Sequence, residues 1–375
     1  MLIVRALLPH DIDRICELMP NFELYLKKPG FKLNMCRVGL LNGQVVGYVL
    51  VEPRLLRYGR ASLNVVMMGS VFIENAHRAR GYDTALMQDA LAFVAEQGAH
   101  LAFIHASHGY GTRFGFSPVF PYYLLAFESS TASRLNVDYI PRPLEPHDIP
   151  YIAALYEKHW NSRVALQRNA ELWLWRIEHG DLPVEVIETP DDGICGYIAG
   201  NSLQPEVEMV ADSPSAALTL IGTAGRRYHH AGFEEVRWLV PPDDMLVTYA
   251  RQLLDVTVSA RYSRAGGWTG RLIETRTLVN ALLPEITAQA TMHDFSDFSP
   301  ERLVLHCQPE RVQIGLDRQP ETFSALTHQD FIQLLFGSTS AHALALTANL
   351  HPSAARLLGN LFPTRAAALA VWDWF

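Results

Sequence analysis

A turn rich in arginine and glycine near residue 80 is the first place where this sequence could do chemistry. It reads Arg78-Ala79-Arg80-Gly81-Tyr82-Asp83-Thr84. The mostly apolar residues 65–73 before it predict a strand, and residues 85–97 after it have apolar side chains at helical spacing. A turn that ends at a helix start leaves backbone N–H groups unpaired at the positive end of the helix dipole, and the arginines add charge. The pattern therefore predicts a pyrophosphate-binding turn, with an ordinary strand-to-helix connection as the alternative.

A second polar run follows the next predicted strand, residues 101–104. It reads His105-Ala106-Ser107-His108-Gly109-Tyr110 and continues as Gly111-Thr112-Arg113-Phe114-Gly115-Phe116. The two histidines have no carboxylate partner in the sequence for a metal site, and Ser107 lacks the Gly-x-Ser-x-Gly elbow of a hydrolase. We therefore expect no metal. Glu74, at the end of the earlier strand, is a further candidate for a base that acts through water, although carboxylates at strand ends are usually just solvated.

An internal repeat indicates how the elements around these residues are organised. Residues 5–15 and 142–152 agree at seven of eleven positions without a gap. Each copy predicts a short strand, a turn containing proline with an aspartate as cap candidate, and an amphipathic helix. The hairpin pattern of residues 41–49 also returns at residues 191–198. The repeat therefore predicts a duplicated α/β domain, with the first boundary near residue 135.

The pattern changes after residue 271. Residues 302–307 and 311–316 predict strands, and residues 327–336 predict a helix before an alanine-rich tail. A third, smaller α+β domain that begins near residue 275 accounts for them. We therefore expect domains over residues 1–135, 136–274 and 275–375, which agrees with a chain of 375 residues.

Composition and charge exclude several classes of function. Hydrophobic residues make up 49% and charged residues 19%, as in globular proteins. The net charge of -8 argues against a nucleic-acid partner and is compatible with cationic substrates. The four cysteines are widely spaced, and neither a secretion signal nor a membrane-spanning run is found. We therefore expect a cytoplasmic protein with no membrane partner.

The two polar runs together resemble the GNAT acetyltransferases, whose acetyl-CoA loop reads Arg/Gln-x-x-Gly-x-Gly/Ala after a central strand. The residues from Arg78 to Asp83 fit except at the last position, and Arg-Phe-Gly-Phe at 113–116 is similar to the second hallmark of the family. More narrowly, the chain resembles the Eis-type branch, with an active GNAT domain, a degenerate one and a small domain like sterol carrier protein. The resemblance implies an α/β fold of tandem GNAT-like domains with mixed central sheets, plus a small α+β domain. The loop motif is missing from the second copy, so one cofactor site per chain is expected.

The resemblance also assigns roles to individual residues. Backbone groups of Val71, Phe72 and Ile73 would pair with the pantetheine arm of acetyl-CoA. The cofactor loop would comprise Arg78, Ala79, Arg80, Gly81, Tyr82, Asp83 and Thr84, and Ser107 and His108 would also touch the cofactor. Tyr110 would be the general acid toward the departing thiolate, and the terminal carboxylate of Phe375 the base toward the amine. Two departures stand out: the usual spacing of the tyrosine falls at Gly111, and Asp83 puts a carboxylate beside the expected pyrophosphate.

The activity that this resemblance implies is an acetyl-CoA-dependent N-acetyltransferase. The acetyl group would pass directly to a primary amine of a cationic acceptor, such as an aminoglycoside, a polyamine or a lysine side chain. The resemblance also implies a homo-oligomer. The alternative is a non-catalytic acyl-CoA-binding or partner-binding protein on a degenerate GNAT scaffold, in which Asp83 and the shifted Tyr110 mark lost chemistry.

Overall fold

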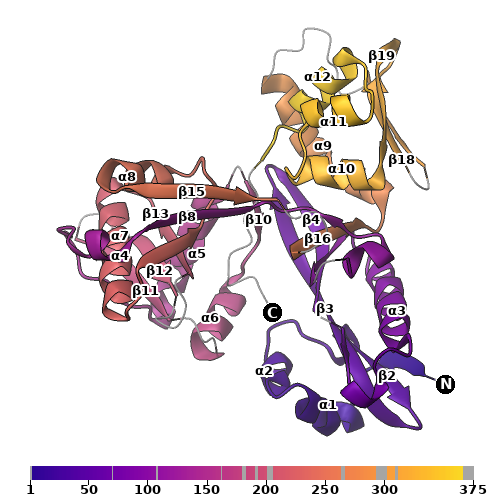
Figure 1. The fold of residues 1–375 in the computed structure, drawn as a ribbon, viewed down its shortest axis with the longest axis horizontal. Helices are drawn as coiled ribbons and strands as arrows, with labels where there is room; N and C mark the ends of the chain where they lie inside the picture. The colour runs from indigo at the N-terminus through magenta and orange to yellow at the C-terminus, as the bar shows by residue number, and fades with distance from the viewer. Residues whose placement is uncertain are drawn as a thin grey trace. The chain divides into compact units, whose positions relative to one another are not determined.

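The computed structural model describes residues 2–69, 71–106, 109–161, 163–179, 183–190, 193–200, 206–262, 267–292, 302–308 and 311–365. It confirms the predicted mixed α/β fold (Figure 1). The chain divides into two compact units. Unit 1 contains the described residues of 1–120 and 263–365, and unit 2 those of 121–262. No helix in the described ranges is long and apolar enough to cross a membrane.

Unit 1 is built on a mixed sheet. In spatial order its strands are β1 (Ile3–Ala6), β2 (Cys36–Leu41), β3 (Gln44–Tyr58), β4 (Ala61–Met68), β6 (Leu101–Ala106), β16 (Gly267–Leu272) and β7 (Ser117–Pro118). β4 and β6 run parallel, whereas the other neighbours in this order are antiparallel. The hairpin predicted over residues 41–49 is confirmed. Asn42 and Gly43 form its turn with φ of 50° and 81°, values that a tight hairpin turn requires at both positions.

Helices cover both faces of this sheet. α3 (Tyr82–Glu96) packs Leu86 and Ala90 against Val49 and Val66. α1 (Ile12–Leu18) and α2 (Phe22–Leu26) share a second core with Leu50 and its neighbours on β2 and β3. Since adjacent residues of a strand point to opposite faces, the two cores lie on opposite sides of β3. α3 is therefore held on one face by a continuous apolar contact, which fixes where its first turn lies.

The strands diverge at the edge of the sheet where α3 begins. The parallel ladder between β4 and β6 ends at the pair Met68 and Ile104. Beyond it, β5 (Phe72–Ile73) pairs with β3, while β6 continues along β16 as far as Ala106. In the part of the chain that the structure describes, no ladder joins β5 to β6. The edge of β5 away from β3 therefore lies outside any described ladder, and its Ile73 carbonyl accepts a hydrogen bond from Arg78.

Unit 2 contains a second mixed sheet. Its strand order is β15 (Val256–Arg261), β8 (Tyr122–Glu128), β14 (Glu235–Leu239), β13 (Glu206–Ala211), β12 (Gly193–Ala199), β11 (Val184–Thr189) and β9 (Arg142–Pro143). Its helices are α4 (Ser129–Ser133), α5 (Ile149–His159), α6 (Ala170–His179), α7 (Pro214–His230) and α8 (Met245–Leu253), and β10 (Val164–Leu166) is a further short strand. The parallel pair is β13 with β14, and α7 packs on these strands. The central elements thus repeat those of unit 1.

The sequence repeat has the same local structure in both copies. In the first, the two terminal nitrogens of Arg5 lie 2.6 and 3.0 Å from the carboxylate oxygens of Asp11, which also accepts the Leu8 N–H at 2.9 Å. In the second, Arg142 and Asp148 are 2.6 and 3.0 Å apart in the same pairing, and the Glu145 N–H donates to Asp148 at 2.9 Å. A bidentate pair of this kind fixes the turn between strand and helix. The sequence repeat therefore corresponds to a repeated turn with the same hydrogen bonds in both units.

The limits of the two units differ from the domain limits expected at residues 135 and 274. β8 precedes residue 135 but pairs with β14 and β15 of unit 2. β16 precedes residue 275 but pairs with β6 of unit 1. Each sheet thus takes a strand from outside its expected segment. Composition could not indicate this, because the polar residues 128–134 just before the expected boundary include the short helix α4.

The carboxyl-terminal part of unit 1 has the predicted α+β pattern. β17 (Leu303–Cys307), β18 (Arg311–Leu316) and β19 (Gln319–Thr327) form an antiparallel sheet, and the helices are α9 (Thr275–Met292), α10 (His328–Leu335), α11 (Ala341–Thr347) and α12 (Pro352–Leu361). The strands predicted at residues 302–307 and 311–316 and the helix predicted at 327–336 are confirmed to within a residue. α10 packs its apolar face toward β16.

We predict that Gly47→Ala destabilises the β3–β5 pairing. A Cβ atom on Gly47 would lie 2.5 Å from the carbonyl oxygen of Phe72 and 2.6 Å from the Ile73 Cδ1, so β5 would have to move. Overpacking of this kind costs about 1–3 kcal/mol of the free energy of unfolding, which denaturant titration measures. The control is Gly39→Ala on β2, where the nearest atoms belong to the flexible side chain of Leu2 at 3.3 Å or more. Equal stabilities of the two variants would contradict the prediction.

Candidate active site

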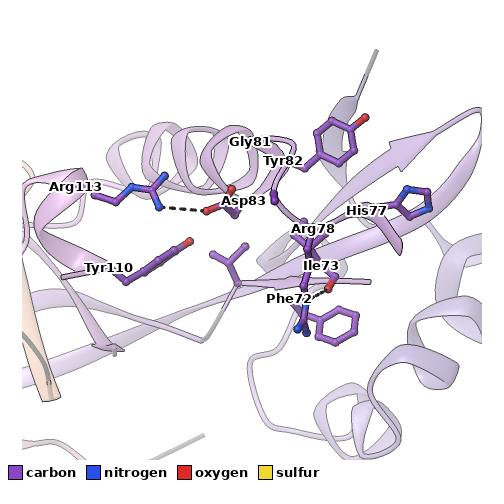
Figure 2. A pocket seen from close by; sticks show the side chains of 11 residues that line it. Phe72, Ile73, His77, Arg78, Gly81, Tyr82, Asp83, Tyr110 and Arg113 are labelled. Atoms are coloured by element: carbon purple, nitrogen blue, oxygen red, sulfur yellow. Dashed lines mark hydrogen bonds and ion pairs between the residues drawn. The ribbon is translucent and has the colours of Figure 1, made fainter. Parts of the chain in front are cut away.

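A pocket of about 470 Å³ lies beside β5 and the first turn of α3 (Figure 2). Nine of the residues singled out from the sequence line it: Val71, Phe72, Ile73, Arg78, Ala79, Gly81, Tyr82, Asp83 and Tyr110. His77 and Arg113 complete the lining. In Figure 2, Tyr110 and Arg113 lie toward one end of the pocket and His77 toward the other. The structure thus brings the arginine-glycine turn and the tyrosine of the second polar run into one site.

The arginine-glycine turn exposes the start of α3. Gly81 is the residue before the helix and has φ of 76°, and Ala79 has φ of 58°. α3, every residue of which is described, begins without a side-chain cap, and a Cβ on Gly81 would meet nothing within 4 Å. Arg78 donates from Nε to the carbonyl of Ile73 at 3.1 Å, which ties the turn to β5. The first N–H groups of α3 are therefore open to an anion at the positive end of the helix dipole.

Asp83 places a negative charge in the first turn of α3, and Arg113 compensates it. One terminal nitrogen of Arg113 lies 3.6 Å from an oxygen of Asp83, and the other donates to Thr84 Oγ1 at 3.1 Å. Arg113 also lies over the rings of Tyr110 and Phe114, with its Cζ 5.8 and 5.5 Å from their centroids. Arg113 therefore connects the second polar run to the start of the helix.

Tyr110 presents a buried hydroxyl to this site. The hydroxyl has no hydrogen-bond partner in the described ranges. Burial, reinforced by the Asp83 carboxylate and opposed by Arg113, raises the pKa of Tyr110 to about 12. The usual family spacing would put a tyrosine at Gly111, but a Cβ there would lie 3.0 Å from Thr269 Oγ1 and 3.2 Å from Phe116 Cβ. A side chain at position 111 would therefore require Thr269 or Phe116 to move.

Other candidates from the sequence have different surroundings. Arg80 is exposed and does not line the pocket. Thr84 reaches the site through its bond to Arg113. The carboxylate of Glu74 is held by Arg14, with an N···O distance of 2.5 Å, and lies outside the lining. Ser107, His108 and Phe375 lie outside the described residues.

Sequence reasoning missed two lining residues. His77 has an Nδ1 atom that is buried without a hydrogen-bond partner among the described residues. It lies in the strand-to-turn segment just before Arg78, and its type alone gave no signal. Arg113 was visible as part of the Arg-Phe-Gly-Phe run, but its pairing with Asp83 depends on a fold that brings residues 83 and 113 together.

The corresponding turn of unit 2 is closed to an anion. Asp212 and Ser213 alone separate β13 from α7, whereas residues 74–81 separate β5 from α3. The Ser213 hydroxyl caps α7 by accepting the Ala216 N–H at 3.3 Å, and Pro214 has no N–H to offer. This geometry supports the expectation of one cofactor site per chain.

Known proteins are similar to this chain in one domain and in the overall fold. Residues 18–119 match the family described as acetyltransferase (GNAT) domain. Three similar solved structures are a GCN5-related N-acetyltransferase from Anabaena variabilis (15% identity, TM-score 0.69), another from Kribbella flavida (14%, 0.67) and Eis1 from Mycobacterium abscessus (17%, 0.60). Each comparison covers 100% of both chains, and at these identities it shows a shared fold. No curated protein matches the sequence. The chain therefore carries a region, residues 18–119, that matches the acetyltransferase (GNAT) domain family.

Proposed function

We propose that this protein is an acetyl-CoA-dependent N-acetyltransferase that transfers the acetyl group directly to a primary amine of a cationic acceptor. The observation that carries the proposal is the uncapped start of α3, open to a pocket that runs along the unpaired edge of β5. A pyrophosphate fits the first feature, because backbone N–H groups and the helix dipole favour an anion there. The amide-containing pantetheine arm fits the second, because free strand groups can pair with amides.

Transfer of the acetyl group requires that the acceptor amine lose a proton and that the departing thiolate be stabilised, and Tyr110 is placed for the second task. Because the pKa of Tyr110 is raised to about 12, its hydroxyl stays protonated at neutral pH. A thiol has a pKa of about 8.5, so we assign Tyr110 to stabilising the departing thiolate by donating a hydrogen bond.

The acceptor must lose a proton, because an alkylammonium has a pKa of about 10.4. The Eis-type resemblance assigns this step to the terminal carboxylate of Phe375, and we retain that assignment as part of the proposal. The pairing of Glu74 with Arg14 argues against the other candidate base. The excess of acidic residues favours a cationic acceptor, so an aminoglycoside, a polyamine and a lysine side chain are the classes to test. The Eis-type arrangement, with a sterol-carrier-like third domain and a homo-oligomer, belongs to the same proposal.

The proposal is tested by calorimetric titration of the protein with acetyl-CoA, followed by assays of thiol release with each amine class. We expect binding in the micromolar range at one site per chain, because the described turn before α3 is open and the one before α7 is capped. We also expect thiol release that depends on the added amine. Binding without thiol release from any amine would favour the non-catalytic acyl-CoA-binding alternative. An absence of binding at millimolar acetyl-CoA would overturn both.

We predict that Tyr110→Phe lowers kcat by about 10²-fold and changes the KM for acetyl-CoA by less than about twofold, because the lost hydrogen bond forms as the thiolate departs. The raised pKa also predicts that Tyr110 contributes no falling limb to the kcat profile of the native enzyme below about pH 10, so the variant keeps the native profile shape. Tyr151→Phe, at an exposed position of α5, is the control. An unchanged kcat would assign the role to another group.

We predict that Asp83→Asn tightens acetyl-CoA binding by about 2–5-fold at low ionic strength. The substitution removes a carboxylate from the anion site and releases Arg113, and a charge at a helix end is worth about 0.3–1 kcal/mol. The gain should shrink with added salt, and the free protein should lose a similar amount of stability. Glu96→Gln, at the other end of α3, removes the same charge far from the turn. Weaker binding of the Asp83 variant would show that the carboxylate supports the site.

A further inference from the structure

A second pocket, of about 920 Å³, lies within unit 1 next to the candidate active site. Residues of α3, of the segment 112–118, of β16 and of the start of α10 line it. Arg113 lines both pockets. Arg113 also donates a hydrogen bond to Thr84 in the first turn of α3. The second pocket therefore adjoins the turn that lines the first pocket.

The lining of this pocket is suited to an anion. It contains Arg113, Arg271 and His328, with further polar side chains from Gln88 and Gln329, and no aspartate or glutamate. This is unexpected in a chain with a net charge of -8. Of the arginines, Arg113 also pairs with Asp83 of the first pocket. The nearby carboxylate of Asp330 is occupied by its hydrogen bonds to Thr327 at the start of α10 and is not part of the lining. A cavity with cationic walls attracts anions and concentrates them.

Arg271 is a half-buried cation in the lining of this pocket. One of its terminal nitrogens donates to the carbonyl of Phe114 at 2.7 Å. No carboxylate among the described residues lies within ion-pair distance of it. Burial lowers the pKa of Arg271, which is the effect of desolvating a cation without a counter-charge. Desolvating an unpaired charge costs free energy, and an anion bound in the pocket would offset this cost.

We propose that this second pocket binds the 3′-phosphate of acetyl-CoA, with Arg271 and Arg113 as its cationic ligands. The inference rests on the proposed function. Acetyl-CoA has a pyrophosphate, for which the start of α3 provides a site, and a separate phosphate on its ribose. That phosphomonoester carries about two negative charges at pH 7 and is matched by the planar donor fork of arginine. Arg113 lines both pockets, so the pocket of Arg271 adjoins the one at the start of α3.

The test compares acetyl-CoA with its 3′-dephospho form by calorimetry. The native protein should bind the dephospho form about 10-fold more weakly, because only the 3′-phosphate contacts are lost. Arg271→Gln should weaken acetyl-CoA binding about 10-fold and leave the affinity for the dephospho form unchanged. Arg271→Lys keeps the charge without the fork and should recover part of the loss.

A second variant avoids the structural bond between Arg271 and Phe114. Gln88→Glu adds a carboxylate to the pocket at an exposed position of α3. It should weaken the binding of acetyl-CoA more than that of the dephospho form. Arg251→Gln, at an exposed position of α8, controls for the change in net charge. Equal losses for both ligands, or no loss with either pocket variant, would overturn the inference while leaving the proposed function intact. Failure of the native protein to bind acetyl-CoA would overturn both.

Discussion

The end of the parallel ladder at Met68 and Ile104 is the constraint on which the rest of the site depends. Two parallel strands that stayed paired would satisfy each other's backbone groups and leave nothing for a ligand. Here β5 is drawn toward β3 instead, where Gly47 lets the backbone of Phe72 approach closely. The bond from Arg78 to the Ile73 carbonyl then sets where the turn leaves β5. The apolar contact of α3 with the sheet fixes the other end of the turn.

Charge in this site is arranged by pairing. A carboxylate in the first turn of a helix stabilises the helix, but it also repels a phosphate that would bind at the same positive end of the dipole. The pairing of Asp83 with Arg113 offsets this effect and brings a guanidinium to the same place. Both side chains are partly exposed, so the pair itself adds little stability. The pair instead changes the electrostatic potential at the start of α3, where an anion would bind. We therefore expect the Asp83–Arg113 pair to affect cofactor affinity.

Local signals in the sequence predicted the elements well and the distant pairings poorly. The hairpin at residues 41–49, the strands after residue 300 and the repeated strand, proline turn and helix depend on residues close in the chain, and the structure has them all. The aspartate of each turn pairs with an arginine and does not cap the following helix. The placement of β8 and β16 depends on pairing across more than a hundred residues, which no local pattern encodes. The same holds for Arg113 beside Asp83 and for the tight packing of Thr269 and Phe116 around Gly111. The sequence motif indicated where the candidate site lies. The pairing of charges in the site could be seen only in the folded structure.

The two units differ in whether the turn before the helix that packs on the parallel strands leaves backbone N–H groups open. In unit 2 the short turn, the Ser213 cap and Pro214 satisfy or remove the N–H groups that unit 1 leaves open. The strand before that turn carries Glu208, which is buried and accepts two bonds from Arg168, at 2.7 and 3.0 Å, and one from Tyr197 at 2.6 Å. These three side chains of unit 2 therefore pair with one another, and losing one partner would leave a buried charge unpaired. Unit 1 instead keeps unpaired groups at its turn, and an open helix start of this kind gains its missing partners when an anion binds.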